Sequence, residues 1–168
     1  MPKGHYTHKP HVPKPRPIVI PIGPSIAYVE LTKGKWALIA VDDIPKISGR
    51  CWFYQPGGYA MSRHIYMHRL LTGALPKTEV DHANGIGLHN LPHNMRVCSS
   101  SQNKFNKGKT ARNASGFKGV SASRGSWYAC IAVEGHSMSL GRFPTPELAH
   151  VAYCEAAQRL HGEFARTE

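Results

Sequence analysis

The sequence predicts an α+β protein made of two small domains, and three observations point to this class. Short apolar segments alternate with polar residues and are separated by glycine-containing turns, which is typical of antiparallel strands. A strand–loop–strand–helix pattern occupies residues 80–106, and a longer amphipathic helix is predicted from Pro146 onward. A chain of 168 residues has room for one ordinary domain or two small ones.

The charge balance predicts a polyanionic partner. The chain has 21 Lys and Arg residues against 10 Asp and Glu residues, a formal net charge of +11. No apolar run approaches the roughly 18 residues of a membrane span, and the N-terminus lacks the apolar core of a secretory signal. We therefore expect a nucleic acid rather than a membrane as the partner, and a location inside the cell.

The cysteine spacing argues against two common small scaffolds. The four cysteines are far apart and form no C-x-x-C pair, so we expect neither a zinc finger nor another structural zinc site. A disulfide framework is not expected in a chain of this length with a normal apolar content, so the thiols are predicted to be reduced and mostly buried.

Composition divides the chain into four segments. Residues 1–24 contain seven prolines, four Lys or Arg and no acid, which predicts an extended basic arm that is disordered without DNA and forms no helix or central strand. Residues 109–115 are polar and contain Ala, Ser and Asn, and we predict a linker there. The two predicted domains are residues 25–108 and 116–168.

The first domain begins with a predicted β-hairpin. Ile26–Leu31 and Trp36–Val41 are strand-like and flank the turn residues Lys33-Gly34. Further strand or mixed segments are predicted at 51–54, 59–61 and 65–71, broken by a proline and two glycines at 56–58.

The pattern at 80–106 places several polar side chains around one helix. Asp81 and His82 end a strand, Met95–Cys98 forms the next strand, and a capping box at Ser99 and Gln102 starts a helix at Ser100. Asn103 and Asn106 share one face of that helix because they are three residues apart.

These residue types fit metal-assisted chemistry. A hard divalent cation prefers oxygen ligands, which Asp81 and the amide of Asn103 can supply, and His82 suits general-base work near neutral pH. Because consecutive strand residues face opposite ways, Asp81 and His82 can serve one site only where the strand bends. By itself, an Asp-His pair indicates a polar loop that carries an ordinary surface histidine.

The spacing resembles the ββα-metal motif of HNH endonucleases, in the form found in phage homing enzymes. Asn94 follows His82 by twelve residues, and Asn103 follows Asn94 by nine. The Ile65–Leu70 and Lys33–Leu38 segments also resemble that family, so the resemblance covers about residues 26–107.

The resemblance implies roles for individual residues. Asp81 and Asn103 would bind one Mg²⁺ or Mn²⁺, His82 would activate water, and Asn94 would hold the loop and orient His82. The products would carry 5′-phosphate and 3′-hydroxyl ends, and double-stranded DNA rather than a small molecule would be the substrate. Other predicted contacts to phosphate or to the ligands come from Asn106, His68, Lys104 and Lys107, although His68 is equally compatible with packing behind the site.

Two residues depart from the family pattern. Ile86 and His89 stand where the family often carries acids, which leaves the stability of the loop open. A zinc site formed by His82, His89 and His93 is the alternative use of these histidines.

The second domain is predicted to contain three short strands and one helix. The strands lie near Phe117–Ser121, Trp127–Val133 and His136–Phe143, and the helix begins at Thr145-Pro146 and ends at Gly162. Alternation and helical spacing predict one shared apolar face, formed by Trp127, Ala129, Ile131, Val133, Met138, Leu140, Leu148, Ala149, Ala152, Tyr153, Ala156 and Leu160.

This domain resembles the Apetala2 (ethylene-response factor) DNA-binding domain across about residues 115–165. The matching segments are Gly116–Val120, Trp127–Ala129, Leu140–Phe143 and the helix around Ala149 and Tyr153. The resemblance implies that the polar sheet face enters the major groove, with Lys118, Arg124 and Arg142 as DNA contacts and Trp127 in the core rather than stacked on a base.

The leading hypothesis is therefore an HNH endonuclease that acts as a monomer or weak dimer in the interior of a phage-infected or bacterial cell. A sequence-specific DNA-binding protein with an inactive nuclease half is the alternative. A third hypothesis is an RNA-binding or chromatin-like protein that uses its positive charge alone, with a steep dependence on salt.

Overall fold

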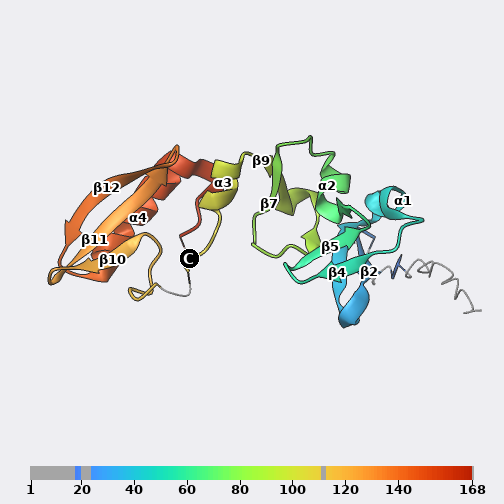
Figure 1. Ribbon diagram of the computed structural model, residues 1–168, viewed down its shortest axis with the longest axis horizontal. Coiled ribbons are helices and arrows are strands. Elements are labelled where there is room, and N and C mark those ends of the chain that lie inside the picture. The colour runs from blue at the N-terminus through green and yellow to red at the C-terminus, as the bar shows by residue number, and fades with distance from the viewer. Residues whose placement is uncertain (1–17, 20–23, 111–112, 168) are drawn as a thin grey trace, which may run out of the picture. The chain divides into compact units, whose positions relative to one another are not determined.

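The computed structural model describes residues 18–19, 24–110 and 113–167 and has the predicted α+β class (Figure 1). Its contacts divide the chain into two units. Unit 1 is drawn from residues 1–71 and 87–91, and unit 2 from residues 72–86 and 92–168.

Unit 1 contains a four-stranded sheet with the order β1-β2-β3-β8. The predicted hairpin is confirmed: β2 pairs antiparallel with β3, and Lys33 and Gly34 in the turn have φ values of 62° and 61°. β8 pairs parallel with β3. The elements are β1 (Ile18–Val19), β2 (Ile26–Glu30), η1 (Thr32–Gly34), β3 (Trp36–Ala40) and β8 (His89–Asn90).

A second sheet and two short helices complete unit 1. The sheet has the order β4-β5-β6 and covers the segments expected to be strand or mixed. Trp52 is 2% exposed, and its indole Nε1 donates a hydrogen bond to the carbonyl of Ile47 at 3.1 Å. The elements are η2 (Val41–Asp43), α1 (Ile44–Ile47), β4 (Phe53–Gln55), β5 (Tyr59–Ser62), β6 (Ile65–Tyr66) and α2 (Met67–Thr72).

The predicted N-terminal arm contributes an edge strand. Ile18 and Val19 pair with Val29 and Tyr28 of β2, so these two residues are ordered by sheet pairing, which differs from the prediction of disorder over residues 1–24. An edge position is the one that a proline-rich segment tolerates, because the lost donors can face away from the sheet. The prediction for residues 1–17 and 20–23 lies outside the described residues.

Unit 2 begins with the predicted strand–loop–strand–helix pattern. β7 (Glu79–His82) pairs antiparallel with β9 (Met95–Cys98), and η3 (Pro92–Asn94) precedes β9. α3 (Ser100–Phe105) starts where the sequence predicts, because the Ser99 hydroxyl accepts from the Gln102 amide and the Gln102 side chain accepts from the Ser99 amide.

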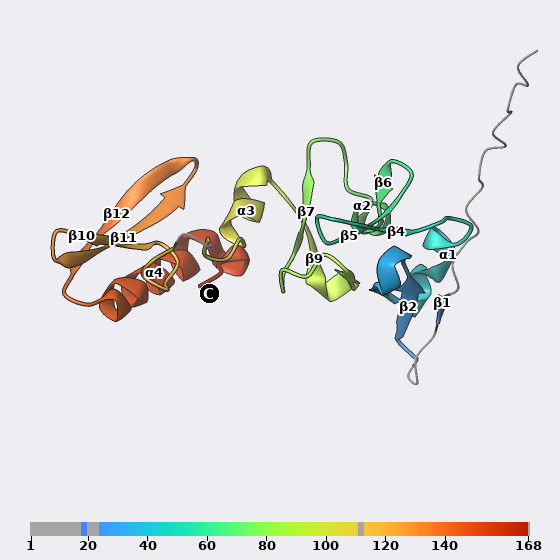
Figure 2. The same ribbon diagram turned by 60° about the horizontal axis from the view of Figure 1, so that its bottom comes forward.

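The C-terminal part of unit 2 is a three-stranded antiparallel sheet with one helix along one face (Figure 2). β10 starts three residues later than the predicted strand, because Ser115 Oγ bonds to both Phe117 and Val120 and keeps the intervening residues in a turn. The elements are β10 (Val120–Ser123), β11 (Ser126–Val133), β12 (His136–Phe143), α4 (Pro146–His161) and η4 (Gly162–Phe164).

The core between this sheet and α4 follows the predicted face with three exceptions. Ala129 and Ile131 of the sheet are buried, as are the helix residues Ala149, Tyr153, Ala156 and Ala157. The exceptions are Met138, Leu148 and Leu160, which are 39%, 49% and 38% exposed.

The exceptions have geometric causes. The strand register shifts between Ala129 and Cys130, which makes Leu140 the extra residue of a β-bulge and directs it into the core, whereas Met138 lies near the sheet end. The buried face of α4 is narrower than the apolar face in the sequence, so Leu148 and Leu160 fall outside it.

The predicted boundary at residues 109–115 is not a boundary of the contact-defined units. The ring of Phe105 in α3 stacks on His161 of α4 with centroids 3.7 Å apart, and Lys118 Nζ donates to the Phe105 carbonyl. The strand pair β7–β9 and α3 therefore share a unit with the C-terminal sheet. The division into a nuclease domain at 25–108 and a DNA-binding domain at 116–168 stays a prediction.

Two further sequence-based expectations concern features of the whole chain. The four cysteines form no disulfide with one another, and Cys98 is buried whereas the other three are half-buried. Within the described ranges, no helix has both the length and the apolar character needed to cross a bilayer.

Gly119 supplies a test of the C-terminal fold. It has a φ of 72°, and a Cβ there would collide with the ring of Tyr153 and lie 2.7 Å from the carbonyl oxygen of Cys130. We expect Gly119→Ala to lower the free energy of unfolding by about 2–4 kcal/mol, from left-handed strain plus overpacking. Gly125→Ala is the matched control, since Gly125 has a φ of 74° with nothing within 4 Å, and it should cost only about 1 kcal/mol. Equal losses in urea unfolding would contradict this account.

Candidate active site

Asp81 and His82 are the last two residues of β7, as predicted, and both are buried. Each is 4% exposed, and the antiparallel register places Asp81 opposite Arg96 and His82 opposite Met95. Gly85 N donates to the His82 carbonyl at 2.7 Å, so the chain turns directly after the histidine. The strand thus ends at the pair, which is the condition for both side chains to serve one site.

Three hydrogen bonds hold the carboxylate of Asp81. Arg96 donates to Oδ2 from Nε at 3.0 Å and also from Nη2, and Asn106 Nδ2 donates to Oδ1 at 2.8 Å. A charge with so little exposure requires such partners, because burial of an unpaired carboxylate is costly. The sequence analysis missed Arg96, although the strand register, once known, sets it directly opposite Asp81.

The helix α3 presents its two asparagines to two carboxylates of β7. Asn103 Nδ2 bonds to Glu79 Oε2, whereas Asn106 bonds to Asp81 and to the His82 carbonyl, the latter at 2.8 Å. Glu79 and Asp81 share a strand face because they are two residues apart. The expected neighbour of Asp81 was Asn103; in this structure Asn106 takes that place, and Glu79 is a carboxylate that the sequence analysis did not single out.

Asn94 holds the loop that follows the histidine. Its Oδ1 accepts from the Asn84 amide and its Nδ2 donates to Asn84 Oδ1, both at 3.1 Å, and its carbonyl accepts from Ala83 N at 2.9 Å. Asn84 Oδ1 also accepts from Ile86 N at 2.9 Å. The turn is therefore closed by asparagines, without an acid at position 86.

Glu79 is held in its anionic form. The hydrogen bond from Asn103 lowers the pKa of Glu79 below its ordinary value of 4.5, against an opposing effect of burial. A hydrogen bond from Ser100 and the charges of Lys107 and Lys104 lower this pKa further. Both lysines are exposed, as expected for residues that contact phosphate.

The predicted DNA contacts of the C-terminal sheet fall into two groups. Arg124 and Arg142 are exposed, and Arg142 Nη1 donates to Ser123 Oγ at 3.2 Å. Lys118 differs from the expected exposed contact, because its ammonium group caps the C-terminal carbonyl of α3 at Phe105. Burial and the nearby Arg166 lower the pKa of Lys118 to about 8.

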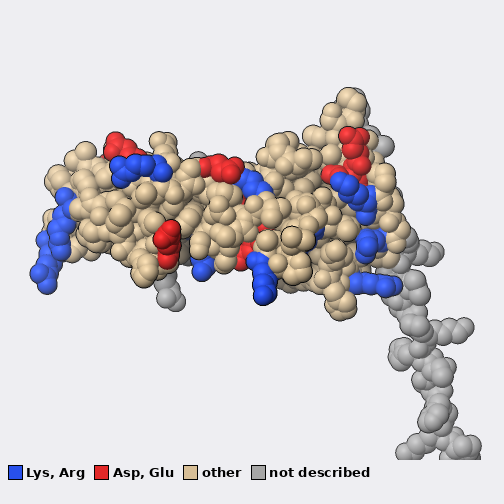
Figure 3. Space-filling model, turned by 90° about the horizontal axis from the view of Figure 1, so that it is seen from above, with Lys and Arg blue, Asp and Glu red and all other residues tan. Residues whose placement is uncertain are grey.

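On the face drawn in Figure 3, Lys and Arg side chains are scattered among uncharged surface and a few Asp and Glu side chains.

His68 belongs to unit 1, whereas the other predicted site residues belong to unit 2. It is 8% exposed and stacks on Tyr66, with ring centroids 5.3 Å apart, while Tyr59 meets it edge-on at 5.2 Å. This aromatic packing fits the structural interpretation of His68, and its role beside the ligands stays a prediction.

The zinc alternative draws its histidines from both units and stays a prediction. Of the three histidines concerned, His82 and His93 lie in unit 2 and His89 in unit 1. In the parts of the chain that the structure describes, no three His, Cys, Asp or Glu side chains come together so that they could hold a metal.

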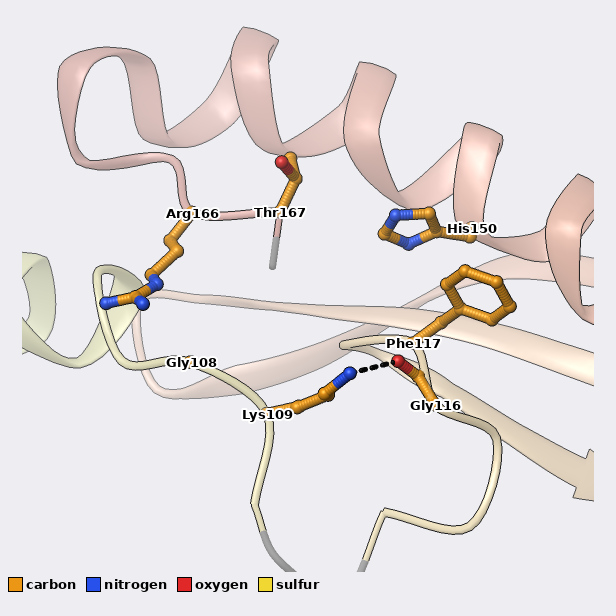
Figure 4. Close-up of a pocket in the computed structure, with 7 residues that line it drawn as sticks. All are labelled: Gly108, Lys109, Gly116, Phe117, His150, Arg166 and Thr167. Atoms are coloured by element: carbon orange, nitrogen blue, oxygen red, sulfur yellow. Dashed lines mark hydrogen bonds between the residues drawn. The ribbon is translucent and has the colours of Figure 1, made fainter. Parts of the chain in front are cut away.

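A pocket of about 520 Å³ lies elsewhere in unit 2 (Figure 4). Lys109 donates to the Gly116 carbonyl at 2.8 Å on one side, and His150 stacks on Phe117 on another. None of the predicted catalytic residues lines it. The lining residues are Gly108, Lys109, Gly116, Phe117, His150, Arg166 and Thr167.

Comparison with known proteins gives two relatives. The chain is 30% identical over 153 residues to an uncharacterized HNH endonuclease of Acanthamoeba polyphaga mimivirus, covering 84% of this chain and 80% of that protein. It is 31% identical over 110 residues to Protein 3.8 of Escherichia phage T7, covering 64% of this chain and 90% of that protein. Each relative covers so much of the 168 residues that the matched region must span residues 81–106, whichever residue it begins at. No protein-family model matches the chain, and no solved structure does.

The contact between Asn103 and Glu79 has a measurable consequence. Removal of the amide donor in Asn103→Ala should raise the pKa of Glu79 toward 4.5, which NMR titration of the carboxyl carbon can follow. A carboxyl group whose pKa is lowered by folding stabilises the protein at pH values above its ordinary pKa. This stabilisation is lost as the pH falls through the pKa of the folded state. The variant should therefore lose less stability than the wild type on acidification below pH 4.5.

Asn106→Ala is the control for this measurement, because Asn106 contacts Asp81 and not Glu79. An unchanged Glu79 pKa in Asn103→Ala, or an equal rise in both variants, would contradict the assignment.

Proposed function

Because the chain belongs to the HNH endonuclease family, we propose that it is a metal-dependent DNA endonuclease of the phage homing type that hydrolyses a phosphodiester of double-stranded DNA. The single observation that carries the proposal is the arrangement around Asp81. A strand pair and the helix α3 hold an acid, a histidine and three asparagines at the positions of the family motif.

The residues around Asp81 fit a divalent cation in their donor chemistry. Asp81 and Asn103 offer carboxylate and amide oxygens, the donors that Mg²⁺ and Mn²⁺ prefer. Asn103 gives its nitrogen to Glu79, which leaves the amide oxygen as its remaining group. The Arg96 guanidinium on Asp81 indicates that this carboxylate stabilises positive charge. We propose one ion per site, held by Asp81 and Asn103.

His82 is the proposed general base. In the proposed step, its imidazole takes a proton from the water that attacks the phosphorus. The bond from phosphorus to the 3′ oxygen breaks, and that oxygen takes a proton from solvent water, which leaves 5′-phosphate and 3′-hydroxyl ends. Its backbone is held by hydrogen bonds: Asn106 and Gly85 donate to its carbonyl, and the carbonyl of Asn94 accepts from the next residue, Ala83. A bound divalent ion supplies neutralisation of the charge that develops on the phosphate and the leaving oxygen.

We propose that the C-terminal sheet binds the target duplex as an Apetala2-type domain. Support comes from the three antiparallel strands with α4 on one face, and from the exposed Arg124 and Arg142. Lys104 and Lys107 near α3 would add phosphate contacts. Because Lys118 caps α3 in the structure, any contact it makes with DNA requires it to leave the Phe105 carbonyl.

One active site per chain sets how many strands a single molecule can cut. A monomer or weak dimer would nick one strand, or cut both after rebinding or dimerisation, in the interior of the phage-infected or bacterial cell. Substrates other than DNA, such as small molecules, are not part of the proposal.

One observation favours the alternative of a DNA-binding protein with an inactive nuclease half. Asp81 and His82 are each 4% exposed, and the Asp81 carboxylate already has three hydrogen bonds. An active enzyme must open this arrangement to admit water and phosphate. The two functions differ in whether metal ions support cleavage.

His82→Ala tests the nuclease directly. Wild type with Mg²⁺ or Mn²⁺ should convert supercoiled plasmid to nicked or linear product, and EDTA should prevent it. Loss of the general base should slow cleavage by about 10²–10⁴-fold while DNA binding persists. His136→Ala, which removes an exposed histidine of β12, is the matched control and should cleave normally. Full activity of His82→Ala would disprove the assignment of the base, and wild type that binds without cleaving would favour the alternative.

Arg142→Gln and Arg124→Gln test the DNA-binding sheet. In EDTA, each should weaken binding of a bound duplex site and reduce the slope of log affinity against log salt by about 1, the value for one lost phosphate contact. Arg159→Gln removes the same charge from the exposed side of α4, and it should leave affinity close to wild type. Equal losses in all three variants in a gel-shift titration would point to net charge rather than to this face.

A further inference from the structure

Arg96 binds one of the two oxygens of the Asp81 carboxylate. Nε at 3.0 Å and Nη2 both donate to Oδ2, which uses the two lone pairs of that oxygen. The Arg96 side chain is 16% exposed, so the pair is shielded from water on both sides. The guanidinium is therefore the resident counter-ion of this carboxylate.

The same guanidinium is held from behind by the C-terminal segment. Nη1 donates to the Glu163 carbonyl, and Cζ lies 4.3 Å from the centroid of the Phe164 ring. Neither contact involves Asp81. Arg96 thus has a second set of partners, a neutral carbonyl and an aromatic face, that would keep it in place after it released the carboxylate.

A divalent ion and Arg96 compete for Asp81. Both are cations directed at one buried carboxylate, and their mutual repulsion is large where water does not screen it. The ion also needs lone pairs of Asp81: both pairs of Oδ2 are in use and Oδ1 accepts from Asn106, so with Arg96 in place only one pair of Oδ1 is left for the ion.

Resting on the proposed function, we propose that Arg96 is a positioning residue that neutralises Asp81 in the metal-free protein and yields the carboxylate to the divalent ion. When it yields, it remains on Glu163 and Phe164. Arg96 therefore sets how much divalent cation the site requires. A purely structural ion pair would instead stay closed whether or not metal is present.

The test is Mn²⁺ binding to the full chain without DNA, followed by electron paramagnetic resonance of free Mn²⁺. Arg96→Gln removes the competing charge and should tighten Mn²⁺ binding by at least about tenfold. Arg96→Lys keeps the charge and should bind Mn²⁺ much as wild type does. Arg159→Gln, with the same loss of charge on exposed α4, should also match wild type.

Stability supplies a second measurement, because Arg96→Gln leaves a buried carboxylate without its counter-ion. The variant should melt earlier than wild type in EDTA, and Mn²⁺ should raise its melting temperature by more than it raises that of wild type. If the variant is unfolded in EDTA, Mn²⁺ should restore its circular dichroism spectrum. The proposal would be overturned if Arg96→Gln neither bound Mn²⁺ more tightly than wild type nor gained more stability from Mn²⁺ than wild type does.

Asp81→Asn separates this inference from the proposed function. If wild type binds Mn²⁺ and Asp81→Asn does not, the metal site stands, and an unchanged affinity in Arg96→Gln then overturns the role of Arg96 alone. If Asp81→Asn leaves Mn²⁺ binding unaltered, the proposed metal site fails, and the inference fails with it.

Discussion

The arrangement of unit 2 depends on one buried carboxylate, that of Asp81. A charge with 4% exposure is stable only with partners that replace water, and here they come from two elements, β9 through Arg96 and α3 through Asn106. Each partner is fixed in turn: Asn106 also binds the His82 carbonyl, and Arg96 also binds the Glu163 carbonyl. The need to satisfy one acid thereby connects both strands, the helix and the C-terminal segment.

Those connections change how the chain is divided. The sequence suggested a nuclease and a DNA-binding domain joined by a linker, but the Phe105–His161 ring stack and the cap that Lys118 places on α3 join their neighbouring parts into one unit. The sheet proposed to contact DNA and the helix beside Asp81 therefore belong to one unit. Positioning of the duplex on the sheet then also positions it relative to α3.

Local signals in the sequence predicted the elements well, because their causes are local. The capping box at Ser99, the helix start at Thr145 and the alternation along β11 are set by residues within a few positions of one another. The ending of β7 at His82 was predictable for the same reason.

Features that depend on tertiary packing were not predictable in this way. Whether Asn103 or Asn106 faces Asp81 depends on how α3 is rotated against β7, and the salt bridge to Arg96 depends on strand register. Alternation placed Leu140 on the apolar face, but the β-bulge there depends on how β12 pairs with β11. The Lys118 ammonium group binds the Phe105 carbonyl, so its direction depends on where the C-terminal end of α3 lies.

The contact between Arg96 and Glu163 also bears on how the protein is made. The two residues are 67 positions apart, so a nascent chain that contains β7, β9 and α3 still lacks one of the groups that fix the counter-ion of Asp81. Contacts of such long sequence separation form late and slow the folding of small domains. The surroundings of Asp81 are therefore completed only after translation has passed residue 163, when β10, β11, β12 and α4 have already been synthesised.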